Sequence, residues 1–263
     1  MSPTERLGRH TIPTSLAHGH LSALVRLAMG MSGLLVLSTI YFLVCLLLMP
    51  WRMVRIRLGN FAGATAGRWI YFVCGLSYEV FGPEIASRAP AIFVQNHTGT
   101  LDLFLSMQLC PAPGSGVMKR EILRVPFFGF GYALSGHLLI DRGNIDSAIR
   151  SMRSTADMVR SNHLSIWILP EGTRSADGRQ QSFKKGFAHL AIQTGLPIVP
   201  IVVHEGHRFW QHGMTVHPGT ICVEVMPPVK TTNWAAETIE EHVRSIEDVF
   251  TATLAAQPEP ERA

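Results

Sequence analysis

The chain has 263 residues, of which 47% are hydrophobic and only 16% are charged, whereas about a quarter of the residues are charged in a typical soluble domain. This length accommodates one sizeable α/β domain and a smaller appendage. The formal net charge of +4 suits an anionic lipid surface or a phosphate-bearing substrate. It does not indicate nucleic-acid binding, because the sequence holds neither a nucleic-acid-binding motif nor a dense stripe of lysine and arginine.

The first feature along the chain is an uncharged segment, residues 27–51, whose central part is almost entirely apolar. As a helix it would cover roughly 35 Å, enough for the ~30 Å hydrocarbon layer of a bilayer. It is longer than the apolar part of a signal peptide, and no Ala-x-Ala-like cleavage site follows it. We therefore expect a membrane-embedded helix, which also accounts for the mean hydropathy of +0.20.

Arginines flank the uncharged segment of residues 27–51. A second apolar patch, residues 69–76, is too short to span a bilayer. Four arginines follow the long segment and three precede it: Arg52, Arg55, Arg57 and Arg68 against Arg6, Arg9 and Arg26. By the positive-inside rule this slight excess favours a cytoplasmic location for the rest of the chain. We assign residues 1–75 to an N-terminal membrane-associated helical element at the cytoplasmic (inner) membrane.

Beyond residue 75, apolar runs of strand length alternate with segments of helical periodicity. The expected strands are residues 76–80, 91–95, 116–118, 138–140, 164–169, 197–203 and 220–225, and the expected helices are residues 100–109, 145–160, 186–193 and 235–255. This alternation predicts an α/β fold with a mainly parallel mixed sheet flanked by helices. We assign residues 76–256 to this domain and residues 257–263 to a disordered tail.

In residues 91–102, AIFVQNHTGTLD, a predicted buried strand leads through a short polar loop into a helix that Thr100 could cap. His97 lies in the loop and Asp102 in the first helical turn. The carboxylate can accept a hydrogen bond from one imidazole nitrogen, which fixes the tautomer and leaves the other nitrogen to accept a proton. With 12 His and 19 acidic residues in the chain, such a spacing also arises by chance, as a loop histidine bonded to a helix cap.

A second polar loop, PEGTRS, follows the apolar run of residues 164–169. Its arginine, Arg174, can bind a phosphate through two hydrogen bonds, and Glu171 can orient a substrate hydroxyl. Gly172 allows the backbone to approach a ligand closely. The alternative is a surface Glu–Arg pair on a turn, which would contribute little to stability.

Four blocks between residues 91 and 203 together resemble the glycerolipid acyltransferase family, especially its bacterial 1-acylglycerol-3-phosphate acyltransferase type. The blocks are NHTGTLD at 96–102, the segment with KREI, PFFG and IDR between 119 and 142, LPEGTRS at 169–175 with FKKG at 183–186, and LPIVPIV at 196–202. The resemblance implies transfer of a fatty acyl group from a thioester donor, acyl-CoA or acyl-ACP, to the free hydroxyl of 1-acylglycerol-3-phosphate, which makes phosphatidic acid. It also implies a two-helix N-terminal element within one leaflet, so spanning and half-inserted arrangements both remain open.

The resemblance also implies roles for individual residues. His97, steered by Asp102, would take the proton of the acceptor hydroxyl, which attacks the thioester without an acyl-enzyme. Backbone N–H groups near the His97 loop or a helix start would meet the oxyanion. The substrate phosphate and glycerol would be bound by six residues: Glu171, Gly172, Thr173, Arg174, Lys119 and Arg142. No cofactor is expected beyond the donor as co-substrate. No metal is expected either, because the neighbouring histidines match no recognised zinc spacing (His204, His207, His212 and His217).

The expected partners are the acyl donor, a membrane lysolipid and the bilayer itself, with no nucleic acid. Three alternatives remain at this stage: another acceptor such as a lyso-ornithine lipid, a membrane-bound thioesterase or hydrolase in which His97 activates water, and a non-enzymatic membrane adaptor. Ser115 lies in Gly-Ser-Gly and does not fit the Gly-x-Ser-x-Gly elbow that would favour a hydrolase. The intact acidic and basic residues of the motifs argue against an adaptor.

Overall fold

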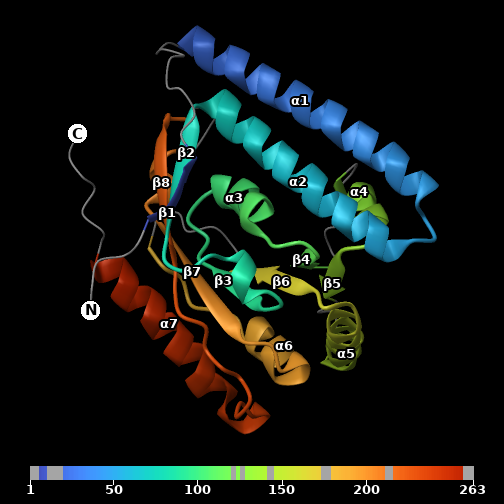
Figure 1. The fold of residues 1–263 in the computed structure, drawn as a ribbon, viewed down its shortest axis with the longest axis vertical. Helices are drawn as coiled ribbons and strands as arrows, with labels where there is room; N and C mark the ends of the chain where they lie inside the picture. Colours follow the sequence, from blue (N-terminus) through green and yellow to red (C-terminus); the bar gives the residue numbers. More distant parts are fainter. Residues whose placement is uncertain are drawn as a thin grey trace.

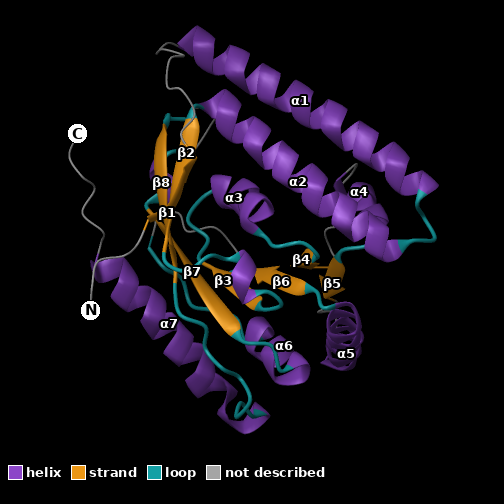
Figure 2. Ribbon diagram, viewed as in Figure 1, coloured by secondary structure: helices purple, strands orange, loops and turns teal. Residues whose placement is uncertain are grey.

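The structure is a computed structural model that describes residues 6–10, 20–119, 123–124, 128–140, 145–172, 179–210 and 216–256. An eight-stranded sheet separates two groups of helices (Figure 1). Helices α1 to α4 cover one face, and α5 to α7 cover the other (Figure 2). The tail predicted at residues 257–263 lies outside the described residues.

Two long antiparallel helices form the N-terminal element, α1 (His20–Leu47) and α2 (Arg52–Cys74) (Figure 1). Helix α1 ends before Pro50, because proline cannot continue the backbone hydrogen-bond pattern of a helix. Its segment Val25–Leu47 has a mean hydropathy of 2.1, and only 11% of its most apolar window is buried. Among the described residues, it alone is long and apolar enough to cross a membrane by length and composition.

The predicted apolar patch at residues 69–76 is not a separate segment. It forms the last turns of α2 and the first residue of the next strand. Helix α2 packs between α1 on one side and α3 on the other. A single residue, Gly75, separates α2 from that strand, and its left-handed conformation (φ +67°) ends the helix.

All seven strands expected from the sequence are present, and the mainly parallel mixed sheet is confirmed. In spatial order the strands are β1 (Arg6–His10), β2 (Leu76–Phe81), β8 (Gly219–Val225), β7 (Ile198–His204), β3 (Ile92–Gln95), β6 (Ser165–Ile168), β4 (Gly114–Lys119) and β5 (Leu138–Ile140). Within this described sheet the neighbours are parallel, except for the pairs β1–β2 and β7–β8. Strand β1 was not predicted; it adds the N-terminal segment to the sheet edge.

The remaining helices connect the strands across the two faces. They are α3 (Leu101–Leu109), α4 (Phe128–Ser135), α5 (Ile145–Asn162), α6 (Gly186–Thr194) and α7 (Ile239–Ala256). Helix α4 was not predicted, because its sequence FGFGYALS carries two glycines and no clear helical periodicity. The short 3-10 helices are η1 (Ala86–Arg88), η3 (Gly206–Arg208) and η4 (Ala236–Thr238).

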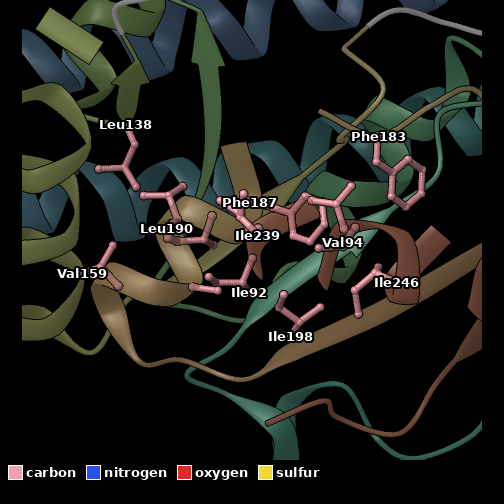
Figure 3. Close-up of a cluster of buried hydrophobic side chains, with 14 of the residues drawn as sticks. Ile92, Val94, Leu138, Val159, Phe183, Phe187, Leu190, Ile198, Ile239 and Ile246 are labelled. Atoms are coloured by element: carbon pink, nitrogen blue, oxygen red, sulfur yellow. The ribbon is translucent and has the colours of Figure 1, made fainter. Parts of the chain in front are cut away.

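Strand β3 lies in the middle of the sheet and is buried along its whole length. Successive side chains of a strand point to opposite faces. Ile92 and Val94 therefore pack with residues of α6 and α7, such as Phe187 and Ile246 (Figure 3), while Phe93 stacks on Trp167 under α2 and α3 at a ring distance of 5.2 Å. Burial on both faces fixes the register of β3 and the position where its polar loop begins.

Candidate active site

The histidine and the aspartate of the first polar loop are in contact. His97 Nδ1 lies 3.2 Å from Asp102 Oδ2. The Asp102 side chain is fully buried, whereas the His97 side chain is 19% exposed. The pair thus combines a carboxylate shielded from water with an imidazole that a substrate can reach.

Asp102 is also held by the backbone of its own loop. Its Oδ2 accepts hydrogen bonds from the amides of Thr98 (2.5 Å) and Gly99 (2.7 Å). The expected cap was wrong in detail, because Thr100 occupies the N-cap position but makes no side-chain cap hydrogen bond. The carboxylate that orients His97 therefore also shapes the start of α3.

Two polar side chains fix the same loop to neighbouring strands. Asn96 exchanges two hydrogen bonds with the backbone of Val203 in β7, at 2.9 and 2.7 Å. Gln95 accepts a hydrogen bond of 2.9 Å from the Trp167 indole of β6. These buried contacts leave the loop little freedom, which preserves the geometry of the His97–Asp102 pair.

The two polar loops are in contact. Strands β3 and β6 are parallel neighbours, so their carboxyl ends lie at the same edge of the sheet. The backbone N–H of His97 donates to Glu171 Oε1 at 3.3 Å. Glu171 is 3% exposed, and its Oε2 has no hydrogen-bond partner in the described part of the chain.

Burial controls the ionisation of Glu171. Desolvation raises the pKa of this carboxyl to about 8, the charge of Asp102 adds to the rise, and the N–H groups of His97 and Gln181 partly oppose it. At neutral pH Glu171 is therefore mostly protonated. In that form it can donate a hydrogen bond from one oxygen while accepting one on the other.

This raised pKa predicts a pH-dependent stability. Between about pH 4.5 and pH 8 the folded state keeps the Glu171 proton, which the unfolded state releases, so Glu171 lowers stability progressively as pH rises. We expect the Tm of Glu171→Gln to fall less than that of the wild type between pH 5 and pH 8.5. Each kcal/mol corresponds to about 2–4 °C, so differential scanning fluorimetry in detergent resolves the difference. The exposed Glu240→Gln serves as control and keeps the wild-type slope; identical slopes for all three proteins would contradict the burial effect.

The other predicted substrate-binding residues are described only in part. Gly172 follows Glu171 in the left-handed conformation (φ +74°), where an added Cβ would lie 3.1 Å from Lys184 Nζ. Lys119 ends β4, whose neighbour is β6, so its backbone lies at the same sheet edge; its side chain is not described. Thr173, Arg174 and Arg142 lie outside the described residues.

A further glycine, Gly206, lies against the site and was not predicted from the sequence. A Cβ added to Gly206 would lie 2.7 Å from Thr98 Oγ1 and 3.0 Å from Asp102 Oδ1. Any side chain here would push the 3-10 turn η3 away from the loop of His97. The available signal was the position of this glycine, two residues beyond the end of β7, where a loop passes the carboxyl edge of the sheet.

Of the four neighbouring histidines in the sequence, His204, His207 and His217 are described. His204 is buried and lies 3.4 Å from Glu224 on β8, and His212 lies outside the described residues. Among the residues that the structure describes, no three His, Cys, Asp or Glu side chains come together as metal ligands.

Comparisons with known proteins show the family to which the chain belongs. Residues 77–204 match the family model described as Acyltransferase. The chain is 38% identical to a 1-acyl-sn-glycerol-3-phosphate acyltransferase of Limnanthes alba, over 86% of this chain and 80% of that protein. It is 32% identical to the enzyme of that name from Escherichia coli, over 66% of this chain and 76% of that protein.

The fold also matches a solved structure, the 1-acyl-sn-glycerophosphate (LPA) acyltransferase PlsC from Thermotoga maritima. The TM-score is 0.66 at 20% identity, over 91% of this chain and 97% of that one. Both polar loops fall inside the segment that the family model covers. The architecture and the sequence therefore lead to one assignment: the chain belongs to the 1-acyl-sn-glycerol-3-phosphate acyltransferase family and is an acyltransferase.

Proposed function

We propose that this enzyme moves a fatty acyl group from a thioester donor, acyl-CoA or acyl-ACP, to the free hydroxyl of 1-acylglycerol-3-phosphate. The product is phosphatidic acid. The names of the relatives support the acceptor. The observation that carries the proposal is the 3.2 Å contact between His97 Nδ1 and Asp102, on a loop bonded to Glu171.

The reaction needs one base and good alignment. Asp102 accepts the Nδ1–H of His97, so Nε2 is free to take the proton of the acceptor hydroxyl as its oxygen attacks the thioester carbonyl. The carbon–sulfur bond then breaks, and the thiolate leaves with the proton that His97 returns. The products are an ester and a free thiol, and no acyl-enzyme is required.

Three amides of the His97 loop do not bind the oxyanion in the proposed reaction. Those of Thr98 and Gly99 bind Asp102, and that of His97 binds Glu171. This modifies the expectation from the sequence, since the oxyanion must be met by donors other than these three N–H groups.

The PEGTRS loop would bind the acceptor. Glu171, protonated at neutral pH, lies against the loop of the base and would hydrogen-bond the glycerol part. Arg174 would hold the phosphate with help from Lys119 and Arg142, while Gly172 and Thr173 would offer backbone close to it. This places the hydroxyl and the phosphate of one acceptor between two neighbouring strand ends.

We place the enzyme at the cytoplasmic face of the inner membrane, with α1 inserted in one leaflet. Apolar side chains of α1 such as Leu35 and Leu47 are exposed, at 69% and 78%. Because α2 packs against both α1 and α3, α1 lies along the catalytic domain and cannot cross a bilayer independently of it. The active site would meet lysolipids by their lateral diffusion.

Arg174→Ala is expected to raise the KM for 1-acylglycerol-3-phosphate by about tenfold or more, since a charge-assisted bidentate contact is lost. The KM for the thioester should change little, because the proposal assigns Arg174 to the phosphate of the acceptor and not to the donor. Steady-state kinetics with each substrate varied in turn make this comparison. Equal effects on both KM values would contradict a phosphate-binding role.

A substrate panel tests the proposed reaction itself. The full-length protein in detergent is incubated with labelled acyl-CoA or acyl-ACP, together with 1-acylglycerol-3-phosphate, a lyso-ornithine lipid or no acceptor. We expect labelled phosphatidic acid from the first acceptor. Preferred labelling of the lyso-ornithine lipid, or labelled free fatty acid formed equally without acceptor, would overturn the proposal in favour of another acceptor or a hydrolase.

A further inference from the structure

A cavity of about 310 Å³ lies away from the His97 loop, at the start of α2. Its wall combines α2, the turn between α4 and β5, and α5, which lie together at one end of the molecule (Figure 1). The polar part of the wall consists of Arg52, Arg55, Gly136, His137, Ser154 and Thr155. The volume falls within the range of about 300–1,000 Å³ that small-ligand sites occupy.

Two arginines of α2 are held in place around this cavity. Arg55 is only 8% exposed, and its Nη1 donates to the carbonyl oxygen of Leu134. Arg52 Nε donates to the carbonyl oxygen of Gly136 at 2.9 Å. The last turn of α4 and the residue after it therefore hold the two guanidinium groups, while further N–H donors of each remain available.

Among the described residues that line the cavity, none supplies a counter-charge to the buried Arg55. Its Nε has no hydrogen-bond partner, and no carboxylate is among the described residues that line the cavity. A buried cation normally pairs with an anion, because an unpaired buried charge is costly. The neutral carbonyl of Leu134 does not fill that role.

The positive charge of the two arginines also affects the ionisation of neighbouring side chains. The Arg52 side chain is exposed overall, but partial desolvation and the charge of Arg55 lower the pKa of its guanidinium. Burial, with the charge of Arg52, lowers the pKa of His137 to about 4, so this imidazole is neutral at pH 7. A bound anion would relieve the repulsion between the two arginines.

We propose that this cavity binds a phosphate group through the guanidinium groups of Arg52 and Arg55. Planar guanidinium forks match phosphate oxygens, and the hydroxyls of Ser154 and Thr155 can add donors. The phosphate belongs either to a phospholipid headgroup or to a free inorganic anion. A phospholipid headgroup would lie near the cavity, because the exposed apolar side chains of Leu47, Met49 and Trp51, just before α2, would contact the bilayer. The cavity shares no lining residue with the site of His97 and Glu171, so the proposal does not depend on the reaction assigned above.

The experiment uses the full-length protein in maltoside micelles, which contain no phosphate. Every protein carries Arg174→Ala, so that the proposed acceptor site contributes little binding. The probes are sodium phosphate, compared with sodium chloride at equal ionic strength, and phosphatidylglycerol added to the micelles. Binding is followed by calorimetric titration and by the shift of Tm.

Two exposed positions allow variants that spare the buried Arg55. Arg52→Gln removes one guanidinium, and Ser154→Asp supplies an internal carboxylate that competes for both. Each is expected to weaken binding by about tenfold or more, as for loss of a hydrogen bond to a charged group. The matched control is Arg57→Gln, which removes an exposed charge from the same helix and should change the Kd by less than about twofold, as expected for an exposed, solvated charge.

Saturable binding of inorganic phosphate would identify a free-anion site, and binding of phosphatidylglycerol alone would identify a headgroup site; either supports the proposal. Three results would overturn it: no saturable binding of either probe, binding that both cavity variants leave unchanged, or an equal loss in Arg57→Gln, which would indicate a general effect of charge.

Discussion

Replacement of His97 by alanine is expected to lower kcat for acyl transfer by a factor of about 10²–10⁴, which is the usual contribution of a general base. The side chain is partly exposed, and its only described hydrogen bond is the one with Asp102. Its loss should therefore leave the fold intact. The measurement is single-turnover transfer from labelled thioester to 1-acylglycerol-3-phosphate, with circular dichroism and Tm to verify folding.

A second histidine gives the matched control for this experiment. His189 lies on α6 and belongs to neither polar loop, and alanine is well tolerated in a helix. His189→Ala should retain most of the wild-type activity. Loss of a general base usually leaves about a hundredth of the rate or less. If His97→Ala kept more than about a tenth of the wild-type rate, His97 could not be the base.

Asp102→Asn is expected to lower kcat by about 10²–10⁴ with a smaller change in either KM, a loss comparable to removal of the base itself. The amide oxygen can still accept the N–H groups of Thr98 and Gly99, so its NH₂ group is left facing His97 Nδ1. An NH₂ donor there favours the tautomer in which Nε2 carries the proton and cannot accept another.

Asp102→Ala separates the chemical role from the structural one. It leaves the buried amides of Thr98 and Gly99 without an acceptor, at about 1–3 kcal/mol each, so this variant should lose stability as well as activity. Urea unfolding in detergent and initial rates distinguish the two variants. Wild-type rates in Asp102→Asn would remove Asp102 from the orientation of His97.

Much of the fold is encoded in local patterns that a reader of the sequence can recognise. The apolar runs before His97 and before Glu171 both have strand length and both end in polar loops, and parallel strands bring such ends to one edge. The bounds of helix α2 were not predicted, because Arg52, Arg55 and Arg57 were interpreted as the flank of a membrane segment and residues 69–76 as a separate apolar patch. Tertiary packing against α1 and α3 decides its length.

Contacts between distant parts of the chain could not be predicted in this way. The bonds of Asn96 to Val203 join residues 107 positions apart, and local spacing carries no information about them. The same holds for Gly206, whose importance depends on its approach to Asp102. Its identity as glycine is visible in the sequence, but the neighbour that excludes a side chain is not.

Helix α2 packs between α1 and α3, and the single residue Gly75 joins it to β2. The described connection between the N-terminal helices and the domain that carries His97 therefore contains no flexible linker. With α1 inserted in one leaflet, as proposed above, the depth of its insertion would set the height of the His97 imidazole relative to the glycerol groups of the lipids. Bilayer thickness and headgroup crowding would then act on turnover mechanically, by raising or lowering the whole rigid body.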